Sequence, residues 1–499
     1  MSTVRSDGLS REKKLRKLAK KKKKLQLERD KLDYKIIQTQ AEYGALYNET
    51  APILNLPIEI LFRISELAHE ASFIEGIPEN PLIEVTISHV CRQWRAIALS
   101  FQSLWSNFRY NVSELPKRIP IDRLVAYLER SGSCLLNLHF TFSESVLGVG
   151  SQALFNSMLE YTISHVDRWR RFSLFSDEEV PMLDFSDRLR QLKAPNLEYF
   201  MCSSSSELGE APDFNGLAPS VFLGGAPKLF YVRLDGSSFR NYPPPFSNVT
   251  VLRLEDDIFQ PDIWNFWSFS LFLEILALPS LSSLSIVGEH FSEPDLPHSS
   301  KITMNNLKHL RYGEDDNLIR HFLPFLVAPL LETLIIKRVT LPLIPSPLPK
   351  FMRPFSNLHS LELIECPDHD ASFINSLVTL TPHVTHLTIV DDSGPENMLE
   401  CVTRPFLENG TKSWPKVKFL ASSRLDDHPI LPYIDFARMI GNPKLTICTD
   451  TGEWAYDDEE SYRSLNAICV LHNGLPDKPK IVSWPPGVDV PAEEDFFTI

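Results

Sequence analysis

The chain has 499 residues, of which 43% are apolar and 23% charged, and its formal net charge is −14. This length and composition fit several folded domains with apolar cores of ordinary size. The charge is uneven, because residues 11–24 hold ten Lys or Arg and one acid, which leaves 40 basic against 63 acidic residues elsewhere. Phosphate contacts need clustered cations, so an acidic body argues against a broad nucleic acid interface.

Secretion and membrane insertion leave marks that this sequence lacks. The seven cysteines are scattered without a Cys-x-x-Cys pair, which predicts reduced thiols rather than a disulfide framework or a zinc site. The first residues are charged and no run of eighteen apolar residues occurs, so we expect neither a signal peptide nor a membrane span. The expected location is cytoplasmic, nuclear or both.

Residues 1–50 are predicted to form a basic helical or coiled-coil spacer, with a helix from about Ser10 to Tyr47. Lys22 and Arg29 occupy seam positions of its heptad, which weakens self-pairing in the first half. The basic run Lys20–Lys24 is compatible with nuclear import, with attraction to nucleic acid or anionic lipid, or with a solvated helix face. The apolar seam residues are Leu15, Leu18, Leu25, Leu32, Ile36, Tyr43 and Leu46.

Residues 51–110 contain two short amphipathic patterns. The first is Leu56-Pro57-Ile58-Glu59-Ile60-Leu61-Phe62-Arg63-Ile64, in which Pro57 suits the first helical turn because it has no amide proton to lose there. The second is Ser88-His89-Val90-Cys91-Arg92-Gln93-Trp94-Arg95-Ala96-Ile97-Ala98. It predicts one helix that places Val90, Trp94, Ile97 and Ala98 on a single face. Leu104-Trp105 follows as another apolar pair.

This arrangement resembles an F-box, in the form common among mushroom-type fungal F-box proteins, over roughly Ala51 to Tyr110. The resemblance implies a module of three short helices that docks on the Skp adaptor of a cullin-based ubiquitin ligase, while the following domain chooses the substrate. Ile64 and Trp105 are interpreted as internal packing, and the insert Phe73–Asn80 is longer than the family pattern. The residues expected to contact the adaptor are Leu56, Pro57, Ile60, Leu61, Val90 and Trp94.

Residues 111–133 are predicted to be a linker and a helix. Prolines and mixed polar residues from Asn107 to Pro120 indicate the linker. Ile121 to Arg130 then has apolar residues on one side, as a helix packed on a neighbour would.

From residue 134 to about 470 a unit recurs that defines the largest predicted domain. Its core is a leucine-like residue, two variable residues, a second leucine-like residue, one variable residue and a third. The units recur about every 28 residues, within the leucine-rich-repeat range of about 20 to 29. They are Leu135-Leu138-Phe140, Trp169-Phe172-Leu174, Leu197-Phe200, Leu229-Val232-Leu234, Val249-Leu252-Leu254, Leu281-Leu284-Ile286, Leu307-Leu310-Tyr312, Leu331-Leu334-Ile336, Leu358-Leu361-Leu363, Val384-Leu387-Ile389, Val417-Leu420 and Leu445-Ile447.

Each unit predicts a short strand whose second and third leucine-like residues face the core, because alternate strand side chains point to opposite faces. Proline precedes several strands, as at Pro227-Lys228, where a residue without an amide donor is tolerated. Leu318–Leu323 and Ala371–Leu377 are predicted return helices. The array resembles those of F-box proteins with leucine-rich repeats and predicts an α/β solenoid with a parallel sheet and outer helices. An ordinary α/β domain with surface strands is the alternative.

The last segment, residues 471–499, is rich in proline and acid. We expect a cap extension followed by flexible chain.

The outward positions of the predicted strands form a candidate surface for a client protein. They are unusually rich in arginine, whose planar fork of donors suits an acidic or phosphorylated segment. The alternative is that these arginines pair with Glu255, Asp256 or neighbouring loop acids. The residues proposed for client contact are Arg171, Tyr231, Arg233, Arg253, His309 and Arg311.

No catalytic constellation is evident in the sequence, so we expect a protein that is not an enzyme and needs no cofactor or metal. Asp368-His369-Asp370 beside Cys366 lacks a second ligand cluster and is interpreted as a chance match to a metal site. The functional prediction is a substrate-recognition subunit of a cullin-type (SCF) ubiquitin ligase, with the Skp adaptor, the cullin complex and an unknown client as partners. The alternative is a scaffold or nuclear interaction protein that uses the F-box only to bind the adaptor.

Overall fold

The chain forms two compact units in a computed structural model that describes residues 3–48, 52–74, 82–111, 120–142, 151–176, 185–204, 216–256, 267–295, 300–339, 354–366, 371–391, 398–424, 430–449, 459–473, 481–482, 484–488 and 493–494. The helical unit comprises Met1–Ala71 and Pro81–Phe101, and the sheet unit comprises Ser72–Asn80 and Gln102–Ile499. Each unit is described below by itself.

The helical unit begins with one long helix, α1 (Thr3–Asn48), which confirms the helix expected from Ser10 to Tyr47. Pairs spaced one turn apart, such as Lys24 with Glu28 and Arg29 with Asp33, support it along its length. All seven seam side chains from Leu15 to Leu46 are more than half exposed. The hydrophobic seam is therefore present on α1, and none of the residues that the structure describes covers it.

Three further helices make the rest of the helical unit: α2 (Ile58–Ile74), α3 (Ile83–Val90) and α4 (Arg92–Ser100). A short 3₁₀ turn, η1 (Pro52–Asn55), precedes them. Phe62 of α2 meets Phe101 edge to face with ring centroids 5.1 Å apart. Buried His69 of α2 lies 3.9 Å from Glu84 of α3, so polar and apolar contacts both join these helices.

The prediction of a single helix from Ser88 to Ala98 is wrong, because the helix is interrupted at Cys91. This residue is extended, with φ −153° and ψ 177°, and it separates α3 from α4. The Cys91 thiol accepts a hydrogen bond from the Trp94 amide at 3.5 Å and so caps α4. Val90 ends one helix and Trp94 belongs to the next, so the two do not share a helical face.

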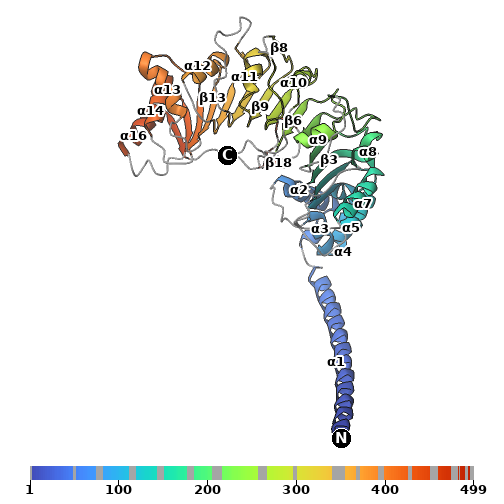
Figure 1. Cartoon of the computed structure of the whole chain (residues 1–499). Helices are drawn as coiled ribbons and strands as arrows, with labels where there is room; N and C mark the ends of the chain where they lie inside the picture. The colour runs from blue at the N-terminus through green and yellow to red at the C-terminus, as the bar shows by residue number, and fades with distance from the viewer. Residues whose placement is uncertain are drawn as a thin grey trace. The chain divides into compact units, whose positions relative to one another are not determined.

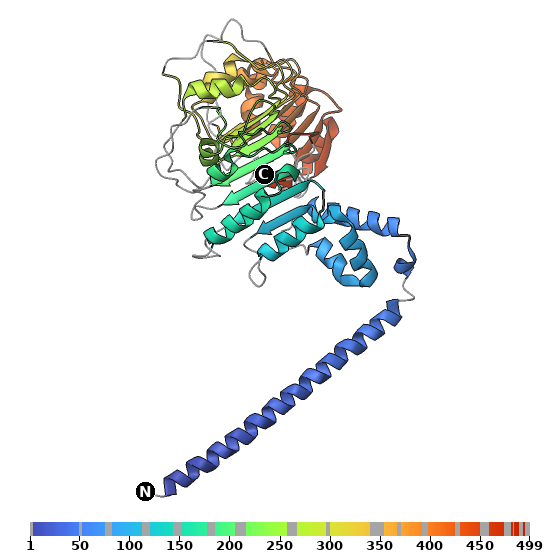
Figure 2. The same cartoon turned by 90° about the vertical axis from the view of Figure 1, so that its right-hand side faces the viewer.

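The sheet unit is α/β and contains a 14-stranded parallel sheet in which neighbours follow chain order (Figure 2), except that two short strands, one between β7 and β9 and one between β9 and β11, pair with each other instead. Its strands are β1 (Asn107–Asn111), β2 (Leu136–Phe142), β3 (Trp169–Ser176), β4 (Tyr199–Ser204), β5 (Tyr231–Leu234), β6 (Val251–Glu255), β7 (Ser283–Val287), β9 (His309–Gly313), β11 (Thr333–Lys337), β12 (Ser360–Ile364), β13 (His386–Asp391), β14 (Phe419–Arg424), β15 (Thr446–Thr449) and β16 (Val470–Asn473).

Two of these strands correct the sequence analysis. The segment Asn107 to Pro120 was expected to be a linker, but it opens with β1, which pairs in register with β2. β16 extends the far edge beyond the last expected unit. Both strands pair with a neighbour through backbone hydrogen bonds, but their sequences lack the leucine-like spacing of the other units. The spacing therefore did not predict them. Two short strands, β8 (Ile302–Thr303) and β10 (Leu326–Val327), form a separate pair.

Helices lie along one face of the sheet, as α10, α11, α12 and α13 do in Figure 1. They confirm the helices expected at Ile121–Arg130, at Leu318–Leu323 and at Ala371–Leu377. The helices and 3₁₀ turns of this unit are η2 (Gln102–Trp105), α5 (Pro120–Arg130), α7 (Ser151–Ile163), η5 (Val166–Arg168), α8 (Phe185–Arg190), α9 (Gly236–Asn241), α10 (Phe269–Leu276), α11 (Ile319–Phe322), η6 (Leu323–Phe325), α12 (Ala371–Leu380), α13 (Met398–Asn409), α14 (Leu431–Ile440) and α16 (Glu459–Ile468). None of the described helices is both long and apolar enough to cross a membrane.

One buried side chain per strand forms a row across the sheet, here called the core row. It occupies the second leucine-like position of each unit and faces the helices, as the stacking of Phe172 on Phe185 of α8 shows. Its burial confirms the inward direction predicted from the spacing. From β4 to β15 the core row is Phe200, Val232, Leu252, Leu284, Leu310, Leu334, Leu361, Leu387, Leu420 and Ile447.

An asparagine side chain ties several units to the preceding one. Asn248 donates its amide to the Pro227 carbonyl at 2.9 Å, and Asn306 does the same to Pro279 at 2.8 Å. Asn357 repeats the contact with Pro329 at 2.8 Å. Each asparagine directly precedes a first leucine-like position, and each acceptor lies two residues before the equivalent position one unit earlier. The recurring hydrogen bond shows that these units stack in one register. It also explains why asparagine recurs before the first leucine-like position, a pattern that the sequence analysis missed.

A left-handed turn recurs after four neighbouring strands. The residues that directly follow β7, β9, β11 and β12 all have positive φ; they are Gly288 (102°), Glu314 (63°), Arg338 (47°) and Glu365 (49°). A residue with a side chain is strained in this region by about 1 kcal/mol or more. Arg338 offsets part of that cost, because its guanidinium lies 3.3 Å from Glu314 and 2.5 Å from Glu365. The charged side chains thus alternate in sign across three units.

The tail also departs from expectation. It was expected to be a cap and then flexible chain, but part of the segment after His472 packs on the sheet, where Trp484 is 3% exposed. Two short antiparallel strands, β17 (Ile481–Val482) and β18 (Glu493–Glu494), flank it in sequence and pair with each other rather than with the large sheet. A buried tryptophan supplies the free energy that holds this segment down.

One buried carboxyl gives the sheet unit a pH-dependent term. Asp235 caps α9, with its carboxylate accepting hydrogen bonds from the Ser238 amide at 2.7 Å and the Ser203 hydroxyl at 2.8 Å. Burial, followed by repulsion from Asp256, raises the pKa of Asp235 to about 7. Because this pKa lies above the unfolded value of about 3.9, the stabilising contribution is present below pH 4 and is lost as pH rises through 7.

The substitution Asp235→Asn should remove this dependence while keeping an acceptor for the cap. We expect the melting temperature of the wild-type chain, measured against that of the variant, to fall as pH rises from about 5 to about 8. Thermal melts followed by circular dichroism check this. The exposed residue Asp122 provides the control, since Asp122→Asn should keep the wild-type profile. If the difference in melting temperature between the wild type and Asp235→Asn does not change with pH, the raised pKa of Asp235 is contradicted.

Candidate partner-binding sites

The helical unit has an apolar stripe along α2. Ile60, Ile64 and Leu67 fall at positions i, i+4 and i+7, so they share one side of the helix. They are 48%, 39% and 47% exposed, which is unusual for large aliphatic side chains spaced as a core face would be. Other exposed apolar residues of the helical unit outside α1 are Ile53, Ile58, Val90 and Leu99.

The six residues expected to contact an adaptor divide into two groups. Pro57, Ile60 and Val90 are exposed, and Leu56 and Trp94 are half-buried. Leu61 is 2% exposed and belongs to the core of the helical unit instead of its surface.

The two residues interpreted as internal packing also differ. That interpretation is wrong for Ile64, because its side chain lies in the exposed stripe. It is confirmed for Trp105, which is buried in the sheet unit and meets Tyr127 edge to face at 5.1 Å.

The face of the sheet opposite the core row, here called the open face, carries all six residues proposed for client contact. Tyr231, Arg233, Arg253, His309 and Arg311 are in positions that alternate with the core row and are buried, while Arg171 is half-buried. The strand register therefore brings them to one face, as the spacing predicted. Their burial leaves little of their surface in contact with solvent.

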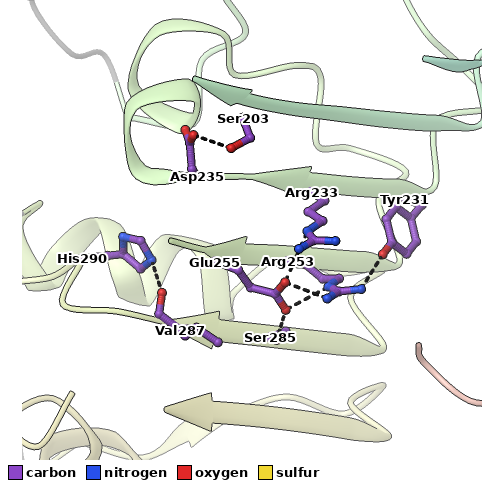
Figure 3. Close-up of polar contacts among 9 residues, drawn as sticks. All are labelled: Ser203, Tyr231, Arg233, Asp235, Arg253, Glu255, Ser285, Val287 and His290. Atoms are coloured by element: carbon purple, nitrogen blue, oxygen red, sulfur yellow. Dashed lines mark hydrogen bonds and ion pairs between the residues drawn. The ribbon is translucent and has the colours of Figure 1, made fainter. Parts of the chain in front are cut away.

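Glu255 is the centre of a charged cluster on the open face (Figure 3). The Arg253 guanidinium donates two hydrogen bonds to its carboxylate, at 2.8 and 2.7 Å. Arg233 approaches the same carboxylate to 3.3 Å from the neighbouring strand, and the Ser285 hydroxyl donates to it from the other side at 2.5 Å. The remaining arm of Arg253 donates to the Tyr231 hydroxyl at 3.1 Å. Arg233 and Arg253 thus pair with Glu255, which is one of the alternatives that the sequence left open.

The electrostatics of this cluster favour a permanently charged Glu255. Burial by itself raises the pKa of the Glu255 carboxyl, but Arg253 and Arg233, with hydrogen bonds from Arg253 and Ser285, lower it to about 2. Because the donor fork of Arg253 is already filled, the cluster supplies structure more than a vacant anion site.

A tryptophan from the tail covers the neighbouring part of the open face. The Trp484 ring lies under the Arg311 guanidinium, 4.4 Å from ring centroid to guanidinium carbon, and 5.8 Å from that of Arg253. Tyr199 and Tyr231, which stack with centroids 4.4 Å apart, complete its apolar surroundings together with Val251, Met201, Phe230 and Val488. Two of the residues proposed for client contact, Tyr231 and Arg311, are therefore occupied by the chain itself.

The sequence analysis did not include Glu255 or Trp484 among its candidate site residues, and the sequence carries only weak signals for them. Glu255 stands two positions after Arg253, and strand alternation alone places both on one face. Trp484 precedes two prolines in a segment with no repeat spacing, so nothing in the pattern connected it to a strand more than 170 residues earlier.

The described residues include no group of three or more His, Cys, Asp or Glu placed to hold a metal ion. Asp368-His369-Asp370 lies outside the described residues. Comparison with models of known protein families finds no match, and no curated protein matches either. Functional inference accordingly depends on the geometry of the two surfaces described above.

The substitution Glu255→Gln should destabilise the sheet unit strongly. It removes the carboxylate charge that pairs with two buried guanidiniums in Figure 3, and breaking a buried pair costs about 3–5 kcal/mol. Urea denaturation followed by circular dichroism measures the loss in the free energy of unfolding.

Glu293→Gln is the matched control for that substitution. Glu293 also pairs with an arginine, at 2.9 Å from Arg320, but both side chains are more than 40% exposed. Its loss should cost less than about 1 kcal/mol. Equal effects of the two substitutions would show that the Glu255 cluster does not stabilise the sheet.

Proposed function

We propose that this chain is the substrate-recognition subunit of a cullin-type (SCF) ubiquitin ligase. The helical unit binds the Skp adaptor through an F-box, and the sheet unit, a leucine-rich-repeat-like solenoid, binds a client protein on its open face. The observation that carries the proposal is the exposed apolar stripe Ile60, Ile64 and Leu67 on the helix that begins in the F-box-like pattern.

Exposure of this stripe supports a docking role. Three large aliphatic side chains on one helical face gain about 1.5 kcal/mol or more each when a partner covers them. An apolar helix face laid into a groove is a common mode of recognition between proteins. Val90 adds an exposed apolar side chain at the end of α3. Leu61 supports the role differently, since its burial fixes α2 within the unit and so keeps the stripe outward.

Client binding by the sheet unit is supported by units that stack in one register and turn one set of side chains from many strands to the same face. The asparagine contacts at Asn248, Asn306 and Asn357 recur at equivalent positions, as expected of a repeat array. Such arrays offer extended surfaces on which a partner can contact several strands at once.

Ubiquitin transfer in this proposal needs no nucleophile from the chain. Five of its seven cysteines are buried, and burial raises the pKa of Cys469 to about 11, which keeps its thiol protonated and unreactive. The chain acts by position, because holding a client lysine near a charged conjugating enzyme makes the transfer effectively intramolecular.

The double substitution Ile60→Asp with Ile64→Asp should abolish adaptor binding without unfolding the helical unit. Both side chains are exposed, so charge there costs the fold little. Losing two apolar contacts of about 1.5 kcal/mol each weakens binding by about 100-fold or more. Affinity of the purified full chain for the Skp adaptor, measured by calorimetry, tests this.

Leu407→Asp supplies the control. Leu407 is 60% exposed on α13 of the sheet unit, and its substitution should leave adaptor affinity unchanged. The proposed function is wrong if the wild-type chain does not bind the adaptor, or if the double variant binds it as tightly as the wild type does.

A further inference from the structure

The Trp484–Val488 segment lies on the open face, where the proposed function places the client. Trp484 inserts between the Tyr199–Tyr231 pair, Val251 and the Arg311 guanidinium. These lining residues come from strands β4, β5, β6 and β9, which are far from the tail in sequence. They form a pocket for a flat aromatic side chain, here called the tryptophan pocket.

The pocket has features of a recognition site. The core row faces the helices, whereas the tryptophan pocket is built from positions on the open face that alternate with the core row. A cation lies over the indole face at 4.4 Å, a contact that favours tryptophan among aromatic side chains. Stacked tyrosines beside it are typical of grooves that bind proline-containing segments.

The segment is attached weakly enough to leave. It adds no strand to the 14-stranded sheet, since β17 and β18 pair only with each other over two residues. Two-stranded pairs of this size are at best marginally stable. Among the described residues of this segment, Trp484 and Pro485 are buried and Val488 is partly buried, so a competing ligand would replace the contacts of only a few side chains there.

We propose that the tryptophan pocket binds a client peptide in which tryptophan is followed by proline, and that the Trp484-Pro485-Pro486 segment occupies the pocket as an intramolecular competitor. This inference rests on the proposed function, which identifies the competing peptide as part of a client. The pocket and the tail segment that fills it do not depend on adaptor binding. Proline after the aromatic residue limits the freedom of the free peptide, so less entropy is lost on binding.

Competition in cis sets the expected size of the effect. A tethered segment acts at an effective concentration of about millimolar. A free peptide with the same residues would have to exceed that concentration to displace it from the wild-type chain. Removing the tryptophan side chain from the tail should leave the pocket open to the free peptide, so its affinity for the variant should be at least about tenfold higher.

The test uses the full-length chain with Trp484→Ala and a fluorescent peptide with the residues 481–488, Ile-Val-Ser-Trp-Pro-Pro-Gly-Val. Fluorescence anisotropy should show binding to the variant at least about tenfold tighter than to the wild type. The same peptide with alanine in place of tryptophan should bind neither protein. Equal affinity of variant and wild type, equal binding of the alanine peptide, or no binding to a folded variant would overturn the proposal.

Arg311 separates recognition by the pocket from general charge attraction. In the Trp484→Ala background, Arg311→Ala should reduce peptide affinity about tenfold or more, because the cation over the indole is lost. Arg320→Ala removes a cation from α11, away from the pocket lining, and should leave peptide affinity unchanged. Similar effects of the two arginine variants would contradict a specific tryptophan pocket.

Hydrogen exchange on the wild-type chain decides the matter if Trp484→Ala does not fold. A removable segment should exchange the amides of Trp484, Gly487 and Val488 much faster than those of β5 and β6. Exchange as slow as in those strands would make the segment part of the core and overturn the proposal. Adaptor affinity is measured separately, so its loss with peptide binding retained would refute the ligase role and leave the pocket standing.

Discussion

The core row is the interaction on which the sheet unit depends. Most of the short strands offer two buried side chains to the helices, one of them in the core row, and these side chains are covered because the strands on both sides supply the same. Leu284, Leu310 and Leu334 illustrate this, since they are paired in register and at most 1% exposed. A single unit of this kind could not bury its apolar side, so the repeats are stable only as a stack.

The same alternation that fills the core row turns the other side chains of each strand to the open face, and near β6 the chain buries these side chains in two ways. Around β6 it places a buried carboxylate, Glu255, between Arg253, Arg233 and Ser285, so every charge has a partner. Next to this cluster it lays its own tail, with Trp484 under Arg311. The first arrangement pairs buried charges, whereas the second fills an aromatic pocket for which we proposed a competing partner peptide.

Strand positions and the inward direction of the core row followed from the sequence, because the leucine-like spacing reports strand alternation directly. The interruption at Cys91 did not, since an extended cysteine whose thiol accepts a hydrogen bond from the Trp94 amide leaves no trace in apolar periodicity. Strands β1 and β16 were also missed, because edge strands need only one partner and can lack the full unit. The pairing of Glu255 with Arg253 was recognised only as an alternative, since spacing gives the face of a side chain but not its partner.

The two units divide the work in this account. The helical unit carries the apolar stripe of α2, which the proposed function assigns to an adaptor, and the sheet unit carries the open face, which it assigns to a client.

The most direct test of that account is the mass of the assembly that the full-length chain forms with the Skp adaptor and a cullin, measured by light scattering during gel filtration. The account predicts one species that contains one copy of each of the three. A chain that elutes apart from the adaptor, or that binds the adaptor but never the cullin, would contradict it.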